Sequence, residues 1–362
     1  MSPPPDPTTP EAQPTRTTSY QVGLARTGVD DDEVVALWSR NAFSRPAERW
    51  RWLYGGDPEN PGTLWTLRLP PGRLVGTAGL ATRRMAIRSG TVLAGQAIDL
   101  VVDGPHRTLG PALQLERSLL ANVAERGIGP IYAFPNERSV AVLRRIGYSR
   151  LGPLERWTRV LRSRSRVSTY VRPALLATVA GAVIDTALRV TSREILYSTP
   201  EGLSIECPAA VDSRFDDLWE AAARRFPVLG ERSAAFLAWR FLRSPFATYE
   251  VLGVVRAKDR SLVGYAVLAT AGTVIRIADL LYRDAAALDT LLGEVIRLAR
   301  GRGASTLTFT FVGPGALAAA LRRHGFARRP ETSSVFVHGG AGPGGALPAA
   351  GEWYLTEADR DV

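Results

Sequence analysis

The residues with the clearest potential for chemistry form a short loop between a strand-like segment and a helical pattern. Arg107, Gly110 and Ala112 stand in the spacing Arg-x-x-Gly-x-Ala, directly before that helix. A loop of small residues entering a helix directs backbone N–H groups outward, with the positive end of the helix dipole behind them. Gly110 lets the backbone approach a ligand closely, and Arg107 adds a charged donor. The loop therefore predicts a site for an anion such as a pyrophosphate.

Pro111 departs from an ideal phosphate loop, because it has no N–H to donate. Proline is also favoured at the first helical position, so a helix started by proline after a glycine turn explains the same residues without a ligand. The flanking strand and helix favour the phosphate interpretation. The predicted binding loop comprises Arg107, Thr108, Leu109, Gly110, Pro111 and Ala112.

The elements that must position this loop follow from hydrophobic periodicity and turn signals. A helix over 111–126 has an apolar stripe and ends at Gly127, the residue type that favours a helix C-terminus. Strands are predicted over 20–26, 64–69, 74–87, 92–102 and 131–134, and further helices after Asp30–Asp32, over 45–54 and over 136–146.

The same pattern recurs in the second part of the chain. Leu143–Arg150 matches Leu321–Arg328, and Asp99 with its neighbours is echoed by Asp279. The two halves therefore look like one fold used twice. Alternating strands and helices predict an α/β architecture, with a mixed sheet covered by helices in each half.

The element order, the repeat and the Arg107–Ala112 loop together resemble the GNAT superfamily (GCN5-related N-acetyltransferases) in a tandem arrangement. The resemblance covers residues 20–160 and 203–356 and implies two tandem GNAT-like acyltransferase domains in a mixed-sheet α+β class. The expected organisation is a disordered tail over 1–18, an acyl-CoA-binding domain over 19–160, a basic and apolar helical linker over 161–202, and a degenerate GNAT-like domain over 203–362.

The resemblance also implies a cofactor and its contacts. The loop is expected to hold the pyrophosphate of an acyl-CoA donor, in the first place acetyl-CoA. The backbone of Leu100, Val101 and Val102 is expected to orient the thioester. Asn136 is a good N-cap for the helix that follows, with Ser139 at the third position, and in similar proteins an asparagine here also contacts the pantetheine arm.

Acyl transfer to an amine needs a base, a stabiliser for the developing oxyanion and an acid for the thiolate. Asp99 is the best-placed carboxylate for the base, although its repetition as Asp279 favours a structural role. Leu143 occupies the position where similar proteins often have a tyrosine as general acid. Tyr148 is the candidate acid and Tyr132 a second one, while core packing is the other explanation for both rings.

The second half lacks the binding loop. Its equivalent turn has no glycine and carries Asp284 where a phosphate would lie, so the carboxylate would repel it. The second half is therefore expected to be structural, or to shape one side of an acceptor pocket.

Aromatic residues before the first long strands have two explanations. They would line a pocket for the acceptor amine, with Asp57 and Glu59 attracting its charge, or they form ordinary core beside a solvated turn, which is the favoured interpretation. The residues are Trp50, Trp52, Tyr54 and Trp65.

Arginines over 156–172 run into the predicted linker and precede an apolar run over 174–184. Arginines beside an apolar helix suggest peripheral contact with anionic lipid. A helix packed between the two halves, with its arginines in water, is the favoured alternative.

Composition excludes several classes. The chain has 362 residues, 45% of them hydrophobic and 22% charged, which is typical of a globular protein of about two domains. A single cysteine, Cys207, allows no internal disulfide, and three histidines without ligand spacing predict no metal site. The formal net charge is +10, but the basic residues are not interleaved with aromatic residues as in nucleic-acid-binding motifs. Nucleic acid is therefore not expected as a partner. Without a secretory signal or membrane span, a cytoplasmic location is expected.

Taken together, the residues and the resemblance predict an acyl-CoA-dependent N-acyltransferase. It would transfer an acyl group directly to a small-molecule amine whose identity the sequence leaves open. The alternatives are a non-catalytic scaffold that binds acyl-CoA or a membrane surface, and an aminoacyl-tRNA-dependent transferase, a class that also uses paired GNAT-like halves.

Overall fold

The computed structural model describes residues 19–41, 43–55, 62–88, 90–162, 199–339 and 347–360. The predicted tail over 1–18 and most of the predicted linker lie outside them. The first part of the chain forms β1 (Gln21–Leu24), α1 (Asp31–Arg40), α2 (Pro46–Tyr54), β2 (Thr63–Leu69), β3 (Arg73–Ile87), β4 (Gly90–Val102), the 3₁₀ turn η1 (Gly104–His106), α3 (Leu109–Glu125), β5 (Ile131–Ala133), α4 (Glu137–Arg145), β6 (Ser149–Pro153) and β7 (Glu155–Val160).

The second part repeats this order with small additions. It forms β8 (Leu203–Glu206), α7 (Ser213–Ala223), β9 (Val228–Gly230), α8 (Ala234–Leu237), η3 (Ala238–Leu242), β10 (Tyr249–Arg256), β11 (Leu262–Ala271), β12 (Val274–Tyr282), α9 (Ala285–Gly301), β13 (Thr306–Phe311), α10 (Gly315–Arg323), β14 (Ala327–Arg329), β15 (Ser334–His338), η4 (Ala350–Glu352), β16 (Trp353–Tyr354) and η5 (Glu357–Asp359).

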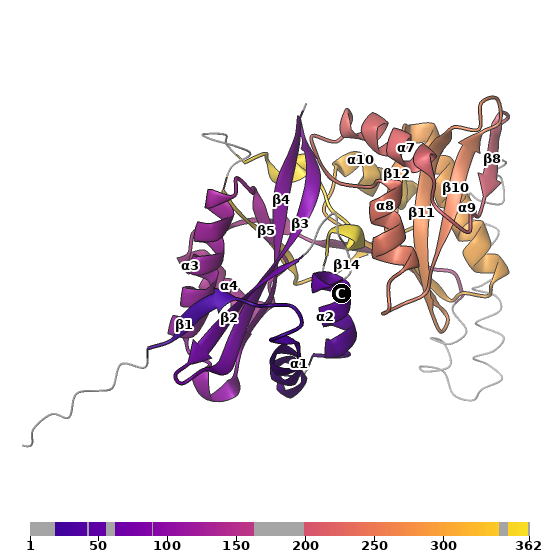
Figure 1. Ribbon diagram of the computed structural model, residues 1–362. Coiled ribbons are helices and arrows are strands. Elements are labelled where there is room, and N and C mark those ends of the chain that lie inside the picture. Colours follow the sequence, from indigo (N-terminus) through magenta and orange to yellow (C-terminus); the bar gives the residue numbers. More distant parts are fainter. Residues whose placement is uncertain are drawn as a thin grey trace, which may run out of the picture.

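Two mixed sheets lie side by side, each covered by helices (Figure 1). The first sheet follows the order β1-β2-β3-β4-β5-β15-β6, and the second the order β14-β7-β13-β12-β11-β10-β8. In the first sheet, α3 and α4 cover one face and α1 and α2 the other (Figure 1). The predicted mixed-sheet α/β class is confirmed.

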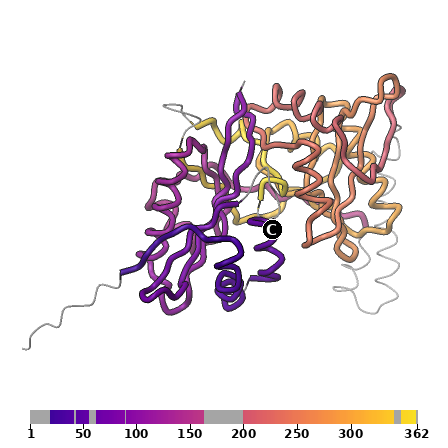
Figure 2. Tube along the Cα trace, in the orientation of Figure 1, coloured from indigo at the N-terminus to yellow at the C-terminus, as the bar shows by residue number. Residues whose placement is uncertain are grey.

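The two sheets exchange strands. β7, from the first part of the chain, pairs with β13 and β14 in the second sheet, while β15, from the second part, lies between β5 and β6 in the first. β9 also pairs with β3. The chain trace accordingly shows the yellow C-terminal segment running between the two sheets (Figure 2). The two sheets therefore cross the predicted division between residues 160 and 203.

A continuous core joins the two halves. Trp52 of α2 stacks on Trp239 of η3 with ring centroids 4.7 Å apart and an angle of 12° between the rings. Arg83 of β3 lies 4.8 Å from the centroid of the Trp239 ring, and buried Arg240 lies 5.6 Å from that of Trp52. Stacked aromatic rings under buried guanidinium groups make this a packed interface.

The feature that creates a site is a divergence of β4 from β5. The two strands pair in parallel only where Gly95–Ala97 of β4 lie beside Ile131–Ala133 of β5. Beyond this point β5 ends and β4 continues. Asp99 has a φ of 53°, in the left-handed region, and the β3–β4 register shifts beside it. Such a bulge bends and twists the strand. It exposes the edge of β4 over Leu100–Val102 next to the start of α3.

Candidate cofactor-binding site

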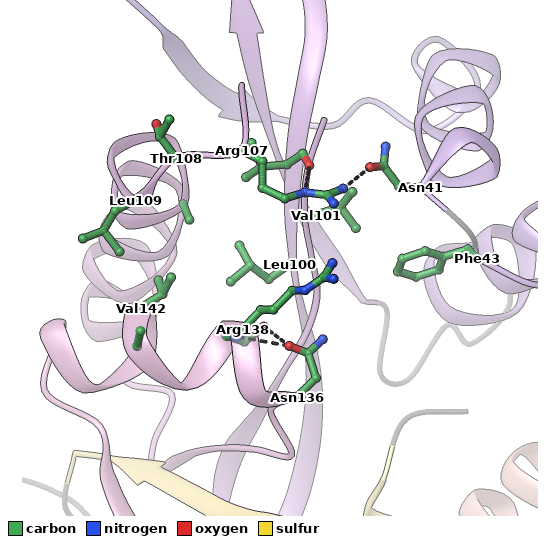
Figure 3. Close-up of a pocket in the computed structure, with 14 residues that line it drawn as sticks. Asn41, Phe43, Leu100, Val101, Arg107, Thr108, Leu109, Asn136, Arg138 and Val142 are labelled. Atoms are coloured by element: carbon green, nitrogen blue, oxygen red, sulfur yellow. Dashed lines mark hydrogen bonds between the residues drawn. The ribbon is translucent and has the colours of Figure 1, made fainter. Parts of the chain in front are cut away.

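A cavity of about 350 Å³ opens between β4, the start of α3 and α4 (Figure 3). None of the described residues lining it is acidic. The cavity is lined by seven residues of the predicted binding loop and β4 edge and by Asn136. The sequence did not identify the remaining lining residues as part of the site. The lining is Asn41, Phe43, Leu100, Val101, Val102, Arg107, Thr108, Leu109, Ala112, Asn136, Arg138, Ser139, Ala141 and Val142.

The start of α3 supplies backbone donors to this cavity. Thr108 is the N-cap in an extended conformation, and its side chain makes no capping hydrogen bond. The first N–H groups of a helix have no carbonyl four residues back, which leaves those of Leu109 and Gly110 available. Ala112, which also lines the cavity, is the first residue in a position to make that helical bond, so its N–H is not counted among the available donors.

Gly110 and Pro111 do not line the cavity itself. Gly110 is exposed, and a Cβ atom built on it would meet nothing within 4 Å. Pro111 is buried in the first turn of α3, as its third residue and not its first, where a missing N–H costs no helical hydrogen bond. Gly110 therefore faces open space next to the free N–H groups, whereas Pro111 contributes to packing.

Arg107 is held toward the cavity by two hydrogen bonds. Its Nε donates to the Val102 carbonyl at 3.2 Å, and its Nη2 donates to Oδ1 of Asn41 at 2.6 Å (Figure 3). Asn41 in turn donates through Nδ2 to Asp103 at 3.3 Å, and Arg40 pairs with the same carboxylate at 3.0 Å. Burial alone would raise the pKa of Asp103, but hydrogen bonds from Asn41 and Arg40 hold it below its ordinary value. Asn41 is therefore the link that orients Arg107.

α4 provides the opposite wall. Oδ1 of Asn136 accepts a hydrogen bond from the Ser139 N–H at 3.0 Å, which confirms the predicted N-cap. Its amide nitrogen remains available to donate. The exposed Arg138 side chain lies between Leu100 and Asn136 in the cavity (Figure 3). Two guanidinium groups, from Arg107 and Arg138, thus serve one cavity that also receives the positive end of a helix dipole.

A second cavity of about 170 Å³ continues from the first. Phe43, Leu100, Asn136 and Ser139 line both, so a ligand that passes Leu100 runs from one into the other. The other residues of the second cavity are Ala97, Ile98, Asp99, Glu116, Ala133, Phe134, Pro135 and Leu143.

No protein-family model matches the sequence, and no curated protein matches it. Solved structures do resemble the chain. A GCN5-related N-acetyltransferase from Anabaena variabilis matches with a TM-score of 0.62 and 15% identity over 88% of this chain and 72% of that one. A tandem GNAT protein from the clavulanic acid biosynthesis pathway matches with a TM-score of 0.52 and 16% identity over 90% and 99% of the two chains.

The N-myristoyltransferase of Saccharomyces cerevisiae, solved with bound myristoyl-CoA, matches with a TM-score of 0.54 and 10% identity over 96% of this chain and 92% of that one. At such identities the likeness establishes the fold. The chain has a tandem GNAT fold. The predicted resemblance is thereby confirmed at the level of architecture.

In the first half of this tandem GNAT fold, Asp99 is held by two partners. Its Oδ1 accepts from Nη2 and Nε of Arg49 at 2.7 and 2.8 Å, and its Oδ2 accepts from the Tyr54 hydroxyl at 2.6 Å. Asp279 repeats this arrangement, with Arg232 at 2.9 Å and the Tyr265 hydroxyl at 2.6 Å. An amine would have to compete for oxygens that are already engaged. The geometry thus shows that Arg49 and Tyr54 hold the side chain of Asp99 at the bulge of β4. The role of Asp99 as a base stays a prediction.

Tyr148 lines neither cavity. Its ring is buried, with a relative exposure of 4%, and its hydroxyl has no hydrogen-bond partner. Burial, with a contribution from the nearby Glu116 charge, raises the pKa of Tyr148 well above its ordinary value. Tyr132 is buried too and also lines neither cavity. The role of either tyrosine as an acid stays a prediction.

The equivalent cleft of the second sheet is closed by the chain itself. Val312, which follows β13, forms a bridge with Leu355, and their two N–H···O bonds measure 2.9 and 2.8 Å. The Tyr354 hydroxyl donates to the carbonyl of Leu280, the counterpart of Leu100. The C-terminal segment over 353–359 therefore lies between the two diverging strands of the second sheet, in the place that corresponds to the open cavity of the first.

The turn before α9 also differs from the loop before α3. Oδ1 of Asp284 accepts from the Ala287 N–H at 2.8 Å and caps the helix. A carboxylate thus occupies the N-terminus that is free in the first half. Both differences place the candidate site in the first half.

The other predicted contacts turn out to be structural where the structure describes them. Trp50, Trp52, Tyr54 and Trp65 are buried in the core, as the favoured interpretation expected, while Asp57 and Glu59 lie outside the described residues. Within the predicted basic cluster, Arg156, Arg159 and Arg162 donate to backbone carbonyls of the second half, and residues 163–198 are not described.

Within the described ranges, no three His, Cys, Asp or Glu side chains stand together in a way that would hold a metal ion. Among the helices of the described part of the chain, none is long and apolar enough to cross a bilayer.

Proposed function

We propose that the protein is an acyl-CoA-dependent N-acyltransferase that uses acetyl-CoA and transfers the acyl group directly to an amine. The observation that carries this proposal is the pair of connected cavities beginning at the free N–H groups of α3 and ending between the diverging strands. The fold supports the same function class, because the solved neighbours include N-acetyltransferases and one chain with myristoyl-CoA bound.

The residues of the first cavity fit a pyrophosphate. The N–H groups of Leu109 and Gly110 would donate to its oxygens, and Arg107 and Arg138 would neutralise its charge. Because Asn41 already orients Arg107, less side-chain entropy is lost when the anion binds. The Asn136 amide and the exposed edge of β4 would hold the pantetheine arm along Leu100.

The second cavity would take the thioester end. Beyond Ala97, β4 has no neighbouring strand on the β5 side within the described chain. The backbone N–H groups of Leu100–Val102 that point away from β3 are therefore free to polarise a carbonyl, while Val101 pairs with Thr77 of β3. Phe43 and Phe134 wall this space, and Arg360 of the C-terminal segment lies 5.4 Å from the centroid of the Phe134 ring. The segment that closes the second cleft thus reaches the wall of the first.

Gly110→Glu is expected to weaken coenzyme A binding by about 100-fold or more. The new carboxylate would lie beside the free N–H groups and repel the pyrophosphate, while a Cβ at Gly110 meets nothing within 4 Å, so the fold is expected to survive. Calorimetric titration of coenzyme A, acetyl-CoA and a phosphate-free pantetheine measures the effect.

The matched control for this experiment is Gly301→Glu at the end of α9, an exposed glycine with equally open surroundings in the second half. It is expected to bind coenzyme A like the wild type. If the wild type binds no coenzyme A, the proposed function is wrong. Tight binding with no acyl transfer to any amine in a broad screen would instead favour the non-catalytic scaffold.

Asn41→Ala is expected to weaken coenzyme A binding by about 5-fold, which corresponds to about 1 kcal/mol for one lost hydrogen bond. The substitution frees Arg107 without removing its charge. Titration at low and high salt checks the result, because the remaining electrostatic attraction should keep its salt dependence. An affinity equal to that of the wild type would show that Arg107 needs no orientation by Asn41.

A further inference from the structure

A carboxyl group lies at the inner end of the site without the partners that buried carboxylates usually have. Glu116 of α3 lines the second cavity, its relative exposure is 2%, and its Oε2 has no hydrogen-bond partner. It follows Ala112 by one helical turn on the face of α3 that points to the sheet. A buried acid left unpaired is costly to a fold, so its position beside a cavity calls for a function.

The titratable groups around Glu116 leave it without a compensating charge. Asp99, across the second cavity on β4, is paired with Arg49 and Tyr54. The charge of Glu116 contributes to the raised pKa of Tyr148, and the His338 ring of β15 packs against Tyr148 with centroids 5.1 Å apart. α4 contributes Leu143 at this end of the cavity. Burial is the cause that raises the pKa of Glu116 to about 7.

We propose, on the basis of the proposed function, that Glu116 is the catalytic acid that protonates the departing thiolate of coenzyme A. The amine nitrogen attacks the thioester carbon, the C–N bond forms and the C–S bond breaks with its electron pair on sulfur. Glu116 gives its proton to that sulfur and becomes a carboxylate. The proton lost by the acylated nitrogen goes to water, and Glu116 regains one from solvent, so the overall reaction releases the amide and the coenzyme A thiol.

The position of Glu116 agrees with this role. A donor that enters past Leu100 reaches the second cavity with its thioester end, and Glu116 and Leu143 form the wall of that cavity on the side of α3 and α4. Leu143 has no proton to give. A carboxyl group that is about half protonated at neutral pH is well matched to proton transfer there.

An infrared titration tests the site without an acceptor. The wild type is expected to show the carbonyl band of a protonated carboxylic acid, and this band should disappear as the pH rises through about 7. The band should be absent in Glu116→Gln. Adding coenzyme A should shift the band, because the thiol end would contact the group. Glu125→Gln, an exposed glutamate at the end of the same helix, should leave the band unchanged.

Kinetics test the role itself, with acetyl-CoA and the amine found in the screen. Glu116→Gln is expected to lower kcat by about 100-fold, a typical contribution of a general acid, with unchanged coenzyme A affinity. The wild-type rate should fall above about pH 7 as the acid ionises, and the variant should lose this limb.

Two results would overturn the inference while leaving the proposed function intact. One is coenzyme A binding that does not perturb the infrared band. The other is a Glu116→Gln variant with the wild-type rate and pH profile. Failure of the wild type to bind coenzyme A would instead remove the proposed function itself, so the two failures are distinguishable.

Discussion

Replacing Arg232 by methionine is expected to lower the free energy of unfolding by about 3–5 kcal/mol. Arg232 is fully buried and pairs with Asp279 at 2.9 Å and Asp359 at 2.5 Å. Burial alone would lower its pKa, but these two carboxylates hold it well above the ordinary value. Methionine fills similar space and leaves both acids buried without a counter-charge. Urea denaturation at neutral pH measures the loss.

The control for this prediction is Arg302→Met. Arg302 pairs with Glu250 at the surface, where its side chain is 43% exposed, and such pairs contribute at most about 1 kcal/mol. Equal destabilisation by the two substitutions would show that burial of the Arg232 network has no special weight. A variant that also replaces Asp279 and Asp359 by leucine should recover part of the loss, because it removes the unpaired charges.

The Arg232 network explains why a repeated fold carries one open site. Thr356 donates to Asp279 at 2.5 Å and Asp359 pairs with Arg232, so the C-terminal segment is tied to the bulge of the second sheet. In the first half the Asp99 side chain at the same bulge is held by Arg49 and Tyr54 from α2, and the Thr77 hydroxyl of β3 donates to the Asp99 carbonyl, so the described C-terminal segment is not part of this network. The first cleft therefore stays open while the second is filled.

Local features were predictable from the sequence because their causes are local. The predicted helix over 111–126 and strand over 92–102 differ by only a few residues from α3 and β4. The N-cap at Asn136 follows from side-chain chemistry and spacing within one turn. The loop that contains Arg107 was equally readable, because its residues act through the helix they precede.

The features that were missed depend on contacts between distant residues. No local signal states that β15 lies between β5 and β6, since strand pairing is decided by the whole sheet. Asn41 and Phe43 reach the site through the placement of α1 against the sheet. Glu116 did leave a signal: a glutamate one turn after Ala112 and three residues before Leu119, on the apolar stripe of α3. A carboxylate in such a stripe is a reason to look for a cavity.

Glu116→Gln is expected to stabilise the protein at pH 8 by about 3 kcal/mol more than it does at pH 4. The ordinary pKa of this carboxyl is 4.5, and burial raises it to about 7 in the folded protein. Between these values the folded state retains a proton that the unfolded state has released, so the wild type loses stability as the pH rises from about 4.5 to 7. The difference between the two pKa values corresponds to about 3 kcal/mol, which glutamine does not lose because it carries no charge.

Urea unfolding of the wild type, Glu116→Gln and the exposed control Glu125→Gln across this range provides the measurement. The wild-type and Glu116→Gln stability curves should separate through this window and run parallel above about pH 7, whereas Glu125→Gln should follow the wild type. Curves that stay parallel throughout would mean that Glu116 ionises as if in water. Glu116 lies beside the inner cavity and weakens the fold at the pH where it is half protonated. A role in proton transfer therefore explains this residue better than a role in stability does.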